Sequence, residues 1–317
     1  MKQLQKIHPA LILLLVLLAI MVLNSPLYQT LPGFMSFLQR AAPLVILACG
    51  ASFVLISGGF DLSSGALITL VVIACALITQ GDPEMAVQAM IAAYGIGLLV
   101  GLVNGLVVTQ LNVPSIIATL GTLLSIRGIA LLWSGGAPSG YLPDNLRYLG
   151  RGVLREMPVT GTLPIAVIVL VICVILCGWL LHRTNFGRLV LMIGDNPKAA
   201  ELAGAPVRRV RVGAFVVSSL TAVTAGLLLG GFSGVSVDVG TGYDLQAIAA
   251  AVIGGVVLMG GRGSIGGACI GALTLYALFT VLNLLGFSQP LRVTVQGLIL
   301  ISAAALTAWQ QNRRSTE

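Results

Sequence analysis

HRTNFGRLVLMIGDNPKAAELAGAPVRRVR, residues 182–211, is a basic segment set between long apolar runs. It holds six of the chain's 17 lysines and arginines within 30 of its 317 residues. The six are Arg183, Arg188, Lys198, Arg208, Arg209 and Arg211. Most of the chain on either side of this segment is apolar enough to lie in lipid. A long polar loop on the cytoplasmic side of such a protein is a place where a soluble partner can bind.

The composition indicates a membrane protein. Hydrophobic residues make up 57% of the chain and charged residues only 9%, whereas a soluble domain carries about 25% charged residues. The apolar runs are continuous rather than alternating, which disfavours a β-barrel. We therefore predict an all-α, polytopic membrane protein.

Charge, cysteine and histidine usage exclude several kinds of site. The net charge of +7 does not indicate nucleic-acid binding, because the basic residues lie in loops beside the apolar runs and act as positive-inside anchors. The two histidines, His8 and His182, flank apolar runs, so no metal site is expected. The cysteines all lie inside apolar runs and are expected to be small buried hydrophobes rather than disulfide partners. They are Cys49, Cys75, Cys173, Cys177 and Cys269.

The apolar runs and their polar breaks predict about ten membrane spans within a single domain, residues 1–317. The expected spans are 9–23, 41–57, 66–80, 85–109, 114–133, 163–181, 212–232, 244–259, 265–285 and 291–309. Several are shorter than the ~20 residues of a full crossing, so some helices are expected to be tilted or broken. The first span is expected to remain uncleaved, because no small-residue cleavage site precedes Pro26.

Charge sets the orientation. With Lys2 and Lys6 inside, alternation places residues 182–211 and the C-terminus in the cytoplasm. The same alternation makes residues 134–161 a periplasmic loop. This loop carries three arginines, which is the one departure from the positive-inside rule.

Two runs of glycines are spaced by four residues. The first is Gly97, Gly101 and Gly105, and the second is Gly263, Gly267 and Gly271. Such a run lines a smooth groove on one helix face and lets another backbone approach closely. The glycine runs could serve packing within the chain, a subunit interface or a moving gate.

A tripeptide that occurs twice in the chain favours an inverted repeat of two five-helix halves. Gly-Gly-Phe follows the second span at residues 58–60 and ends the seventh span at residues 230–232. Five spans separate the two copies, so their orientations in the membrane would be opposite, as in many transporters. The two glycine runs do not align under the same shift.

Five polar residues are candidates for the lining of a translocation pathway. In SGGFDLSSG, residues 57–65, two glycines break the helix before Asp61 and Ser63, which could either cap the next helix or line a pathway. Arg127 lies near the middle of a span, where an ionisable residue is a functional candidate by default. Asn104 and Asp244 are weaker candidates, and Asp244 could simply cap a helix.

The basic segment contains the signals of a short helix. Asp195 or Asn196 is a good N-cap and Pro197 suits the first helical position. The residues that follow favour a helix, and a glycine with a nearby proline ends it. They are Lys198, Ala199, Ala200, Glu201 and Gly204. The segment is longer than the 2–8 residues of ordinary helix connections, which favours a docking role, with the alanines available to a partner's cleft.

The chain cannot form the usual phosphate-binding loop. Its three lysines are Lys2, Lys6 and Lys198, and none follows a glycine, so the motif G-x-x-x-x-G-K-[ST] does not occur. If ATP drives the protein, another polypeptide must bind it. No nucleophile–base pair is visible either, so the chain is not expected to be an enzyme.

Three motifs in order resemble the ribose-type sugar permeases of bacterial ABC importers. The first is G-G-F-D-L-S-S-G at residues 58–65. The second combines T-x-x-G-R at 184–188 with G-x-N-x-x-A-A-x-x-x-G at 194–204. The third is G-Y-D-L-Q-A-I-A-A-A-V-I-G-G at 242–255, followed by G-G-R-G at 260–263. One departure is Phe60, where the family usually has isoleucine.

This resemblance implies a ten-helix permease that pairs with a second permease chain, identical or related. It also implies a periplasmic sugar-binding protein and a cytoplasmic ATPase with two cassettes, which binds ATP and Mg²⁺; the permease itself holds no cofactor. The short helix at residues 196–204 would be the coupling helix seated in that ATPase. The implied location is the bacterial inner membrane. The alternative is an ion-coupled secondary transporter of small polar solutes, which would be expected to show buried carboxylates.

Overall fold

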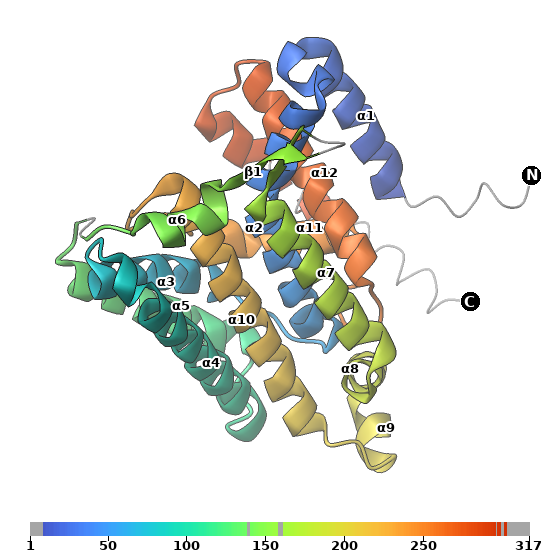
Figure 1. The fold of residues 1–317 in the computed structure, drawn as a ribbon. Helices are drawn as coiled ribbons and strands as arrows, with labels where there is room; N and C mark the ends of the chain where they lie inside the picture. Colours follow the sequence, from blue (N-terminus) through green and yellow to red (C-terminus); the bar gives the residue numbers. More distant parts are fainter. Residues whose placement is uncertain (1–8, 138–139, 158–160, 296, 299–300, 303–317) are drawn as a thin grey trace, which may run out of the picture.

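The computed structural model describes residues 9–137, 140–157, 161–295, 297–298 and 301–302, and it is built mainly of helices (Figure 1). The helices of the first half are α1 (Pro9–Asn24), α2 (Leu31–Ile56), α3 (Ser64–Thr79), α4 (Ala86–Gln110), α5 (Ser115–Ser134) and α6 (Asp144–Arg151). Those of the second half are α7 (Ile165–Arg183), α8 (Asn185–Asp195), α9 (Pro197–Leu202), α10 (Val207–Ser233), α11 (Tyr243–Ile253) and α12 (Ile265–Leu284). Two 3-10 turns, η2 (Pro26–Gln29) and η3 (Pro83–Met85), precede α2 and α4.

Six of the described helices are long and apolar enough to cross a membrane, and three further apolar helices are shorter. The shorter ones are α1, α3 and α11. All nine coincide with predicted spans, so the polytopic all-α class is supported. The tenth predicted span, 291–309, lies partly outside the described residues; residues 289–295 are helical.

The second predicted span begins too late, because α2 starts at Leu31 rather than near residue 41. The Thr30 hydroxyl caps this helix by accepting a hydrogen bond from the Gly33 amide at 3.2 Å, and Pro32 occupies the first turn, where it needs no amide partner. The helix then carries Gln39 and Arg40. These polar residues were mistaken for the edge of the span.

The eighth predicted span, 244–259, is also wrong in its extent. The helix α11 ends at Ile253, and Gly254 and Gly255 follow it, with Gly255 at φ +87°. Eleven residues rise only about 16 Å, roughly half of the ~30 Å apolar core of a bilayer. A helix of this length cannot cross the membrane alone.

Two long helices, α2 and α10, form the centre of the bundle, and the two short helices lie across them. The short helix α3 packs on α10, and α11 packs on α2 in the reciprocal arrangement. Each short helix follows the end of a long one through an irregular segment, residues 57–63 or 234–242. The chain therefore turns back into the bundle twice.

The remaining spans cover the central pair. The helix α4 packs on α10 and α5 packs on α3, while α12 and α7 pack on α2. The first helix, α1, packs on α12 through a separate apolar cluster that includes Leu14, Leu17, Met21 and Val281. The α1 helix is thereby part of the packed bundle.

The first glycine run lies where α4 meets α10. A Cβ built at Gly101 would lie 2.7 Å from the Cα of Val216, and one built at Gly105 would lie 2.7 Å from the Cα of Val212. A Cβ at Gly97 would collide with Val223. The second run, Gly263, Gly267 and Gly271, adjoins Ile56 and the backbone of residues 250–254. Both runs therefore serve close packing within this chain.

We expect Gly101→Ala to lower the melting temperature of the purified protein, because the new methyl group would meet backbone atoms of α10. Overpacking of this kind costs about 1–3 kcal/mol. The matched control is Gly95→Ala on the same helix, since a Cβ at Gly95 meets nothing within 4 Å. Equal melting temperatures for the two variants, measured by differential scanning fluorimetry in detergent, would contradict the close contact.

The segment 134–161 is not a plain loop. It contains α6 and the strand β1 (Val153–Met157), which pairs antiparallel with β2 (Gly161–Pro164). This hairpin is a small correction to the all-α prediction. The helix α6 packs on α10, and the side chain of Gln39 on α2 donates to the Gly150 carbonyl at 2.8 Å.

The basic segment 182–211 is also largely helical rather than a loop. It consists of the end of α7, the helices α8 and α9, and the first turn of α10. The seventh predicted span began too late, at residue 212, because Arg208, Arg209 and Arg211 were assigned to a loop. These residues lie on α10.

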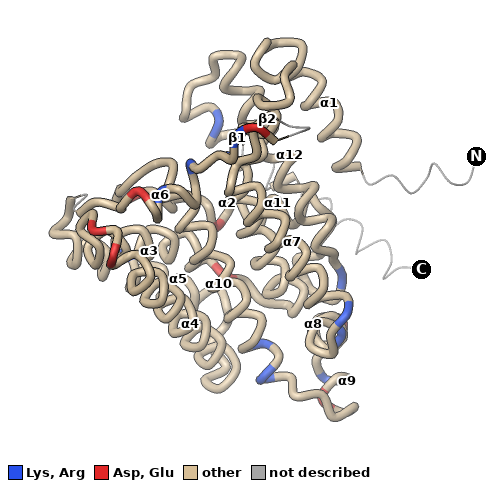
Figure 2. Tube along the Cα trace, in the orientation of Figure 1, with Lys and Arg blue, Asp and Glu red and all other residues tan. Residues whose placement is uncertain are grey.

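Charge is divided between the two ends of the bundle. Figure 2 shows lysine and arginine gathered around α8, α9 and the start of α10, whereas aspartate and glutamate lie near α6, at the β1–β2 hairpin, at the facing ends of α3 and α5, and inside the bundle near α2 and α10. Basic residues also lie near β1 and above α12 in the same view. The end that carries α9 is the one that the positive-inside rule favours for the cytoplasm.

Candidate functional site

The short helix predicted in the basic segment is confirmed as α9. The Asn196 side chain accepts a hydrogen bond from the Ala199 amide at 3.0 Å, which makes Asn196 rather than Asp195 the N-cap. Pro197 is the first helical residue, and Gly204 has φ +81° just beyond the end. Asp195 is instead the last residue of α8, a helix that the sequence analysis missed.

The helix α9 projects from the bundle at its basic end (Figure 1). The residues Lys198, Ala199 and Glu201 are exposed. Leu202 is 91% exposed, the highest value among the large hydrophobic side chains of the described residues. Ala200, by contrast, is 1% exposed and faces the chain itself. The surface available to a partner is therefore centred on Leu202 and not on Ala200.

The C-terminal end of α8 packs closely against the end of α2. A Cβ at Gly194 would collide with the carbonyl oxygen of Ile56, the last residue of α2. The same oxygen accepts a hydrogen bond from the Gly261 amide at 2.9 Å. Movement of the α8–α9 pair would therefore act directly on the segment that follows α2.

That segment contains Asp61, which is the centre of a buried hydrogen-bond network. The Ser218 hydroxyl on α10 donates to Asp61 Oδ2 at 2.7 Å, and the Ser63 hydroxyl donates to Asp61 Oδ1 at 2.7 Å. The side-chain amide of Asn104 on α4 donates to Ser63 Oγ at 2.9 Å. Thr122 on α5 in turn donates to Asn104 Oδ1 at 2.6 Å. The network thus joins three helices, α4, α5 and α10, to the irregular segment 57–63 that leads into α3.

The Asp61 carboxylate is 3% exposed, and no ion pair to it is found among the described residues. Its partners are the two serine hydroxyls and the Ser63 amide, which donates to Oδ1 at 3.0 Å. Hydrogen bonds to a charged group are worth about 1.5–3 kcal/mol each, and a buried acceptor left unpaired costs as much. The network therefore strongly favours this arrangement of α3, α4, α5 and α10 over others.

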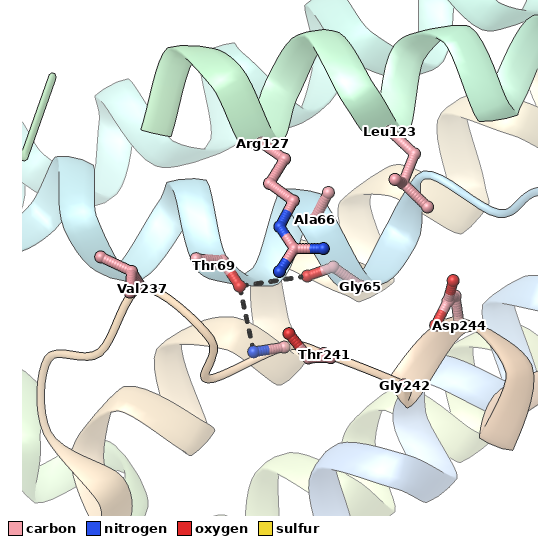
Figure 3. Close-up of a pocket in the computed structure, with 10 residues that line it drawn as sticks. Gly65, Ala66, Thr69, Leu123, Arg127, Val237, Thr241, Gly242 and Asp244 are labelled. Carbon is pink, nitrogen blue, oxygen red and sulfur yellow. Dashed lines mark hydrogen bonds between the residues drawn. The ribbon is translucent and has the colours of Figure 1, made fainter. Parts of the chain in front are cut away.

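The other two pathway candidates, Arg127 and Asp244, line a separate pocket of about 120 Å³. Figure 3 shows Arg127 reaching from α5 toward α3 and the segment before α11. Its guanidinium lies 3.2 Å from Asp238 Oδ1, and both side chains are more than half exposed. One side of the pocket is the contact between α3 and the segment that precedes α11, where the Gly240 amide donates to Thr69 Oγ1 at 3.0 Å.

The five candidate residues therefore fall into two groups. Asp61, Ser63 and Asn104 form one buried network, and Arg127 and Asp244 line one open pocket. Two network members, Ser218 and Thr122, were missed, since a serine or threonine within a span gives no signal of its own. Ser63 occupies the N-cap position of α3, but its side chain makes no cap hydrogen bond and donates to Asp61 instead.

None of the five cysteines is paired in the structure. Among the described residues, no group of three or more His, Cys, Asp or Glu side chains could hold a metal ion. The arrangement brings together a buried hydrogen-bond network, an exposed short helix at the basic end, and close contacts between α8 and the end of α2.

Comparison with known proteins assigns the chain to a family. The family described as the permease component of the branched-chain amino acid transport system matches residues 33–304. The ribose import permease RbsC of Escherichia coli K12 is 34% identical over 297 residues, which cover 93% of this chain and 91% of the relative. The chain belongs to the ribose-type permeases of ABC importers. The permease is similarly 34% identical to RbsC of Bacillus subtilis 168, over 95% of this chain and 92% of the relative.

A second group of relatives is named for a different cargo. The permease is 35% identical to the autoinducer 2 import system permease LsrC of Enterobacter sp. 638, over 94% of this chain and 85% of the relative. No solved structure matches the permease. The family resemblance drawn from the three motifs is confirmed, and the protein is a multi-pass transmembrane subunit of an ABC importer.

Proposed function

We propose that this permease forms, together with a second permease subunit, the translocation pathway of an ATP-driven importer for a sugar or related polyol in the bacterial inner membrane. The observation that carries the mechanism is α9, a capped two-turn helix that presents Leu202, 91% exposed, at the basic end of the bundle. We propose that this leucine, with the exposed Lys198, Ala199 and Glu201 beside it, forms the surface that the partner ATPase covers.

The coupling helix acts on the bundle through two connections. In one direction α9 continues through Pro206 into α10, which carries Ser218. In the other it continues through Asn196 into α8, whose Gly194 abuts Ile56. Both routes converge on Asp61. We propose that ATP binding by a cytoplasmic ATPase with two cassettes moves α9, and that the Asp61 network makes α3, α4, α5 and α10 follow as one body.

The proposed topology has ten spans with both termini in the cytoplasm and residues 134–161 in the periplasm. The division of charge between the two ends supports the orientation. The reciprocal packing of α3 on α10 and α11 on α2 supports an inverted repeat of two five-helix halves. A periplasmic sugar-binding protein would then meet the α6 end, and ATP with Mg²⁺ would be bound only by the ATPase.

The pathway is proposed to run past the pocket of Arg127 and Asp244, between the two permease subunits. An ion pair with both partners more than half exposed is too costly to face lipid near the middle of a span. It must face water or another protein. The outer face of α5 also carries Gly121 and Ser125, both exposed, and such small residues favour close helix contact.

We expect Arg127→Gln to lower uptake about tenfold or more at normal membrane abundance, because Asp238 then lacks its cation in the pathway. Uptake of the labelled sugar by cells measures the effect. The double variant Arg127→Asp with Asp238→Arg restores the pair and should recover part of the activity. Full uptake activity in Arg127→Gln would contradict the proposal that Arg127 lines the translocation pathway.

The competing function is an ion-coupled secondary transporter, and the buried Asp61 carboxylate is the observation in its favour. The two functions differ in their energy source, which proteoliposomes with the permease, its ATPase and its binding protein can separate. We expect uptake that requires ATP in the compartment of the ATPase and that persists when protonophores collapse the proton gradient. Uptake that follows the gradient without ATP would overturn the proposal.

The identity of the cargo can be determined by a ligand screen with the cognate binding protein. The relatives are named for ribose and autoinducer 2, so these two ligands, pentoses, hexoses and polyols form the set to screen. A ligand that raises the melting temperature of the cognate binding protein and is taken up by the proteoliposomes is the cargo.

A further inference from the structure

A second cavity, of about 210 Å³, lies at the α9 end of the molecule, between the C-terminal end of α4, α9 and the first turn of α10. Three cationic side chains line it, Lys198, Arg208 and Arg211, together with the single carboxylate of Glu201. It is separate from the Arg127 pocket, with which it shares no lining residue.

The positive charge of this cavity is not balanced by the chain. The ion pairs found among the described residues involve Arg127 and Arg151 only, so the three cations make none within that part of the protein. The Nε of Arg211 is buried and has no hydrogen-bond partner there. A buried donor without an acceptor is costly, and an oxyanion in the cavity would supply the acceptor.

The start of α10 adds to the positive potential. This helix has 27 residues, no acidic residue in its first turn and no side-chain cap at its N-terminus. The free amides and the helix dipole at such an end favour a negatively charged group, phosphate above all. The cavity therefore offers an anion both fixed cationic side chains and a helix terminus.

The cavity lies at the C-terminal end of α4, next to the apolar outer face of this helix. The outer face of this helix exposes Leu98, Leu102 and Leu106 at helical spacing, and the cavity begins one turn beyond, at Val108 and Thr109. Lipid acyl chains lying along these leucines would bring the headgroup to the level of Arg208. This position favours a lipid over a soluble anion as the source of the phosphate.

We propose that this cavity binds the phosphate group of an anionic phospholipid, with Arg208, Arg211 and Lys198 as its ligands. Arg211 also borders the neighbouring cavity beside Gly58 and Phe60, and its Nη2 lies 3.9 Å from the place of a Cβ at Gly58. A bound headgroup would therefore hold the α9–α10 corner and Arg211 in place beside segment 57–63. The site does not depend on the transported cargo. The proposed orientation of the permease places the bound lipid in the cytoplasmic leaflet.

The test is native mass spectrometry of the full-length permease in detergent, titrated with phosphatidylglycerol, phosphatidylcholine or inorganic phosphate. We expect retained phosphatidylglycerol, little phosphatidylcholine, and about fivefold weaker phosphatidylglycerol binding in Arg208→Gln, since a basic residue contributes about 1 kcal/mol near an anionic surface. The matched control is Arg209→Gln, an exposed neighbour that does not line the cavity. It should bind as the unchanged protein does.

Each alternative outcome is decisive. Equal loss of binding in Arg208→Gln and Arg209→Gln would mean general surface attraction and would overturn the site. Competition by millimolar inorganic phosphate with no preference for phosphatidylglycerol would overturn the lipid as occupant. Arg211 is half-buried, and a substitution there could disturb folding. The test therefore substitutes the exposed Arg208. Lipid binding is measured without transport, so failure here leaves the proposed import function unaffected.

Discussion

We expect Leu202→Asp to abolish uptake and the co-purification of the ATPase, while the permease reaches the membrane in normal amount. The side chain is 91% exposed and contributes nothing to the packing of the chain, so the substitution leaves the fold intact. At a partner's surface, loss of a central apolar contact costs 2 kcal/mol or more, which weakens binding about thirtyfold. The measurement is sugar uptake together with pull-down of the ATPase.

The control for this prediction is Leu202→Met, which keeps an apolar side chain of similar volume and should retain most activity. Ala200→Arg is a poorer probe, because Ala200 is buried against the chain and an arginine there would disturb α9 itself. Gly204→Arg is compromised by the φ of +81° at that position. Normal uptake by Leu202→Asp would refute the coupling role of this surface.

We expect Asp61→Asn to reduce uptake by more than tenfold and to lower the melting temperature of the purified permease. The carboxylate accepts hydrogen bonds on both oxygens, from Ser63 and Ser218. An asparagine offers one acceptor oxygen and directs a donor at a second donor. The expected cost is that of breaking a buried charged network, about 3 kcal/mol.

Substitution of two neighbouring serines on α10 can distinguish the effect of losing the Asp61 network from the effect of disturbed packing. Ser218→Ala removes the hydrogen bond to Asp61, whereas Ser219→Ala removes only a bond to the Phe215 carbonyl of its own helix. Both side chains are buried. We expect uptake per ATP hydrolysed to fall in Ser218→Ala and to stay near normal in Ser219→Ala. Equal behaviour of the two variants would mean that Asp61 is a structural residue without a role in coupling.

Local signals in the sequence were sufficient for much of the fold. The cap of α9 was predicted as Asp195 or Asn196, and Pro197 and Gly204 predicted its start and end, because such residues act through their own backbone neighbours. Continuous apolar runs located nine helices. The errors fell where polar residues belong to a helix, as with Arg40 on α2 and the arginines at the start of α10.

The parts of the candidate site that were missed depend on contacts between distant residues. Ser218 lies 157 residues from Asp61, and Asp238 lies 111 residues from Arg127. Neither serine nor aspartate at these positions is distinguishable in the sequence from a routine helix or loop residue. The burial of Ala200 could not be predicted from the sequence either, because it depends on how α9 packs against the rest of the chain.

The most direct test of the account is a cross-link between position 202 and the ATPase. The five native cysteines would be replaced, and Leu202→Cys or Leu154→Cys would be introduced; Leu154 lies on β1, away from α9. The account predicts that a short bifunctional maleimide joins the permease to a cysteine in the cleft of the cognate ATPase from position 202, with a yield that changes on ATP binding, and not from position 154. Failure to cross-link from position 202 in an assembled, active complex would contradict the claim that α9 receives the movement of the ATPase.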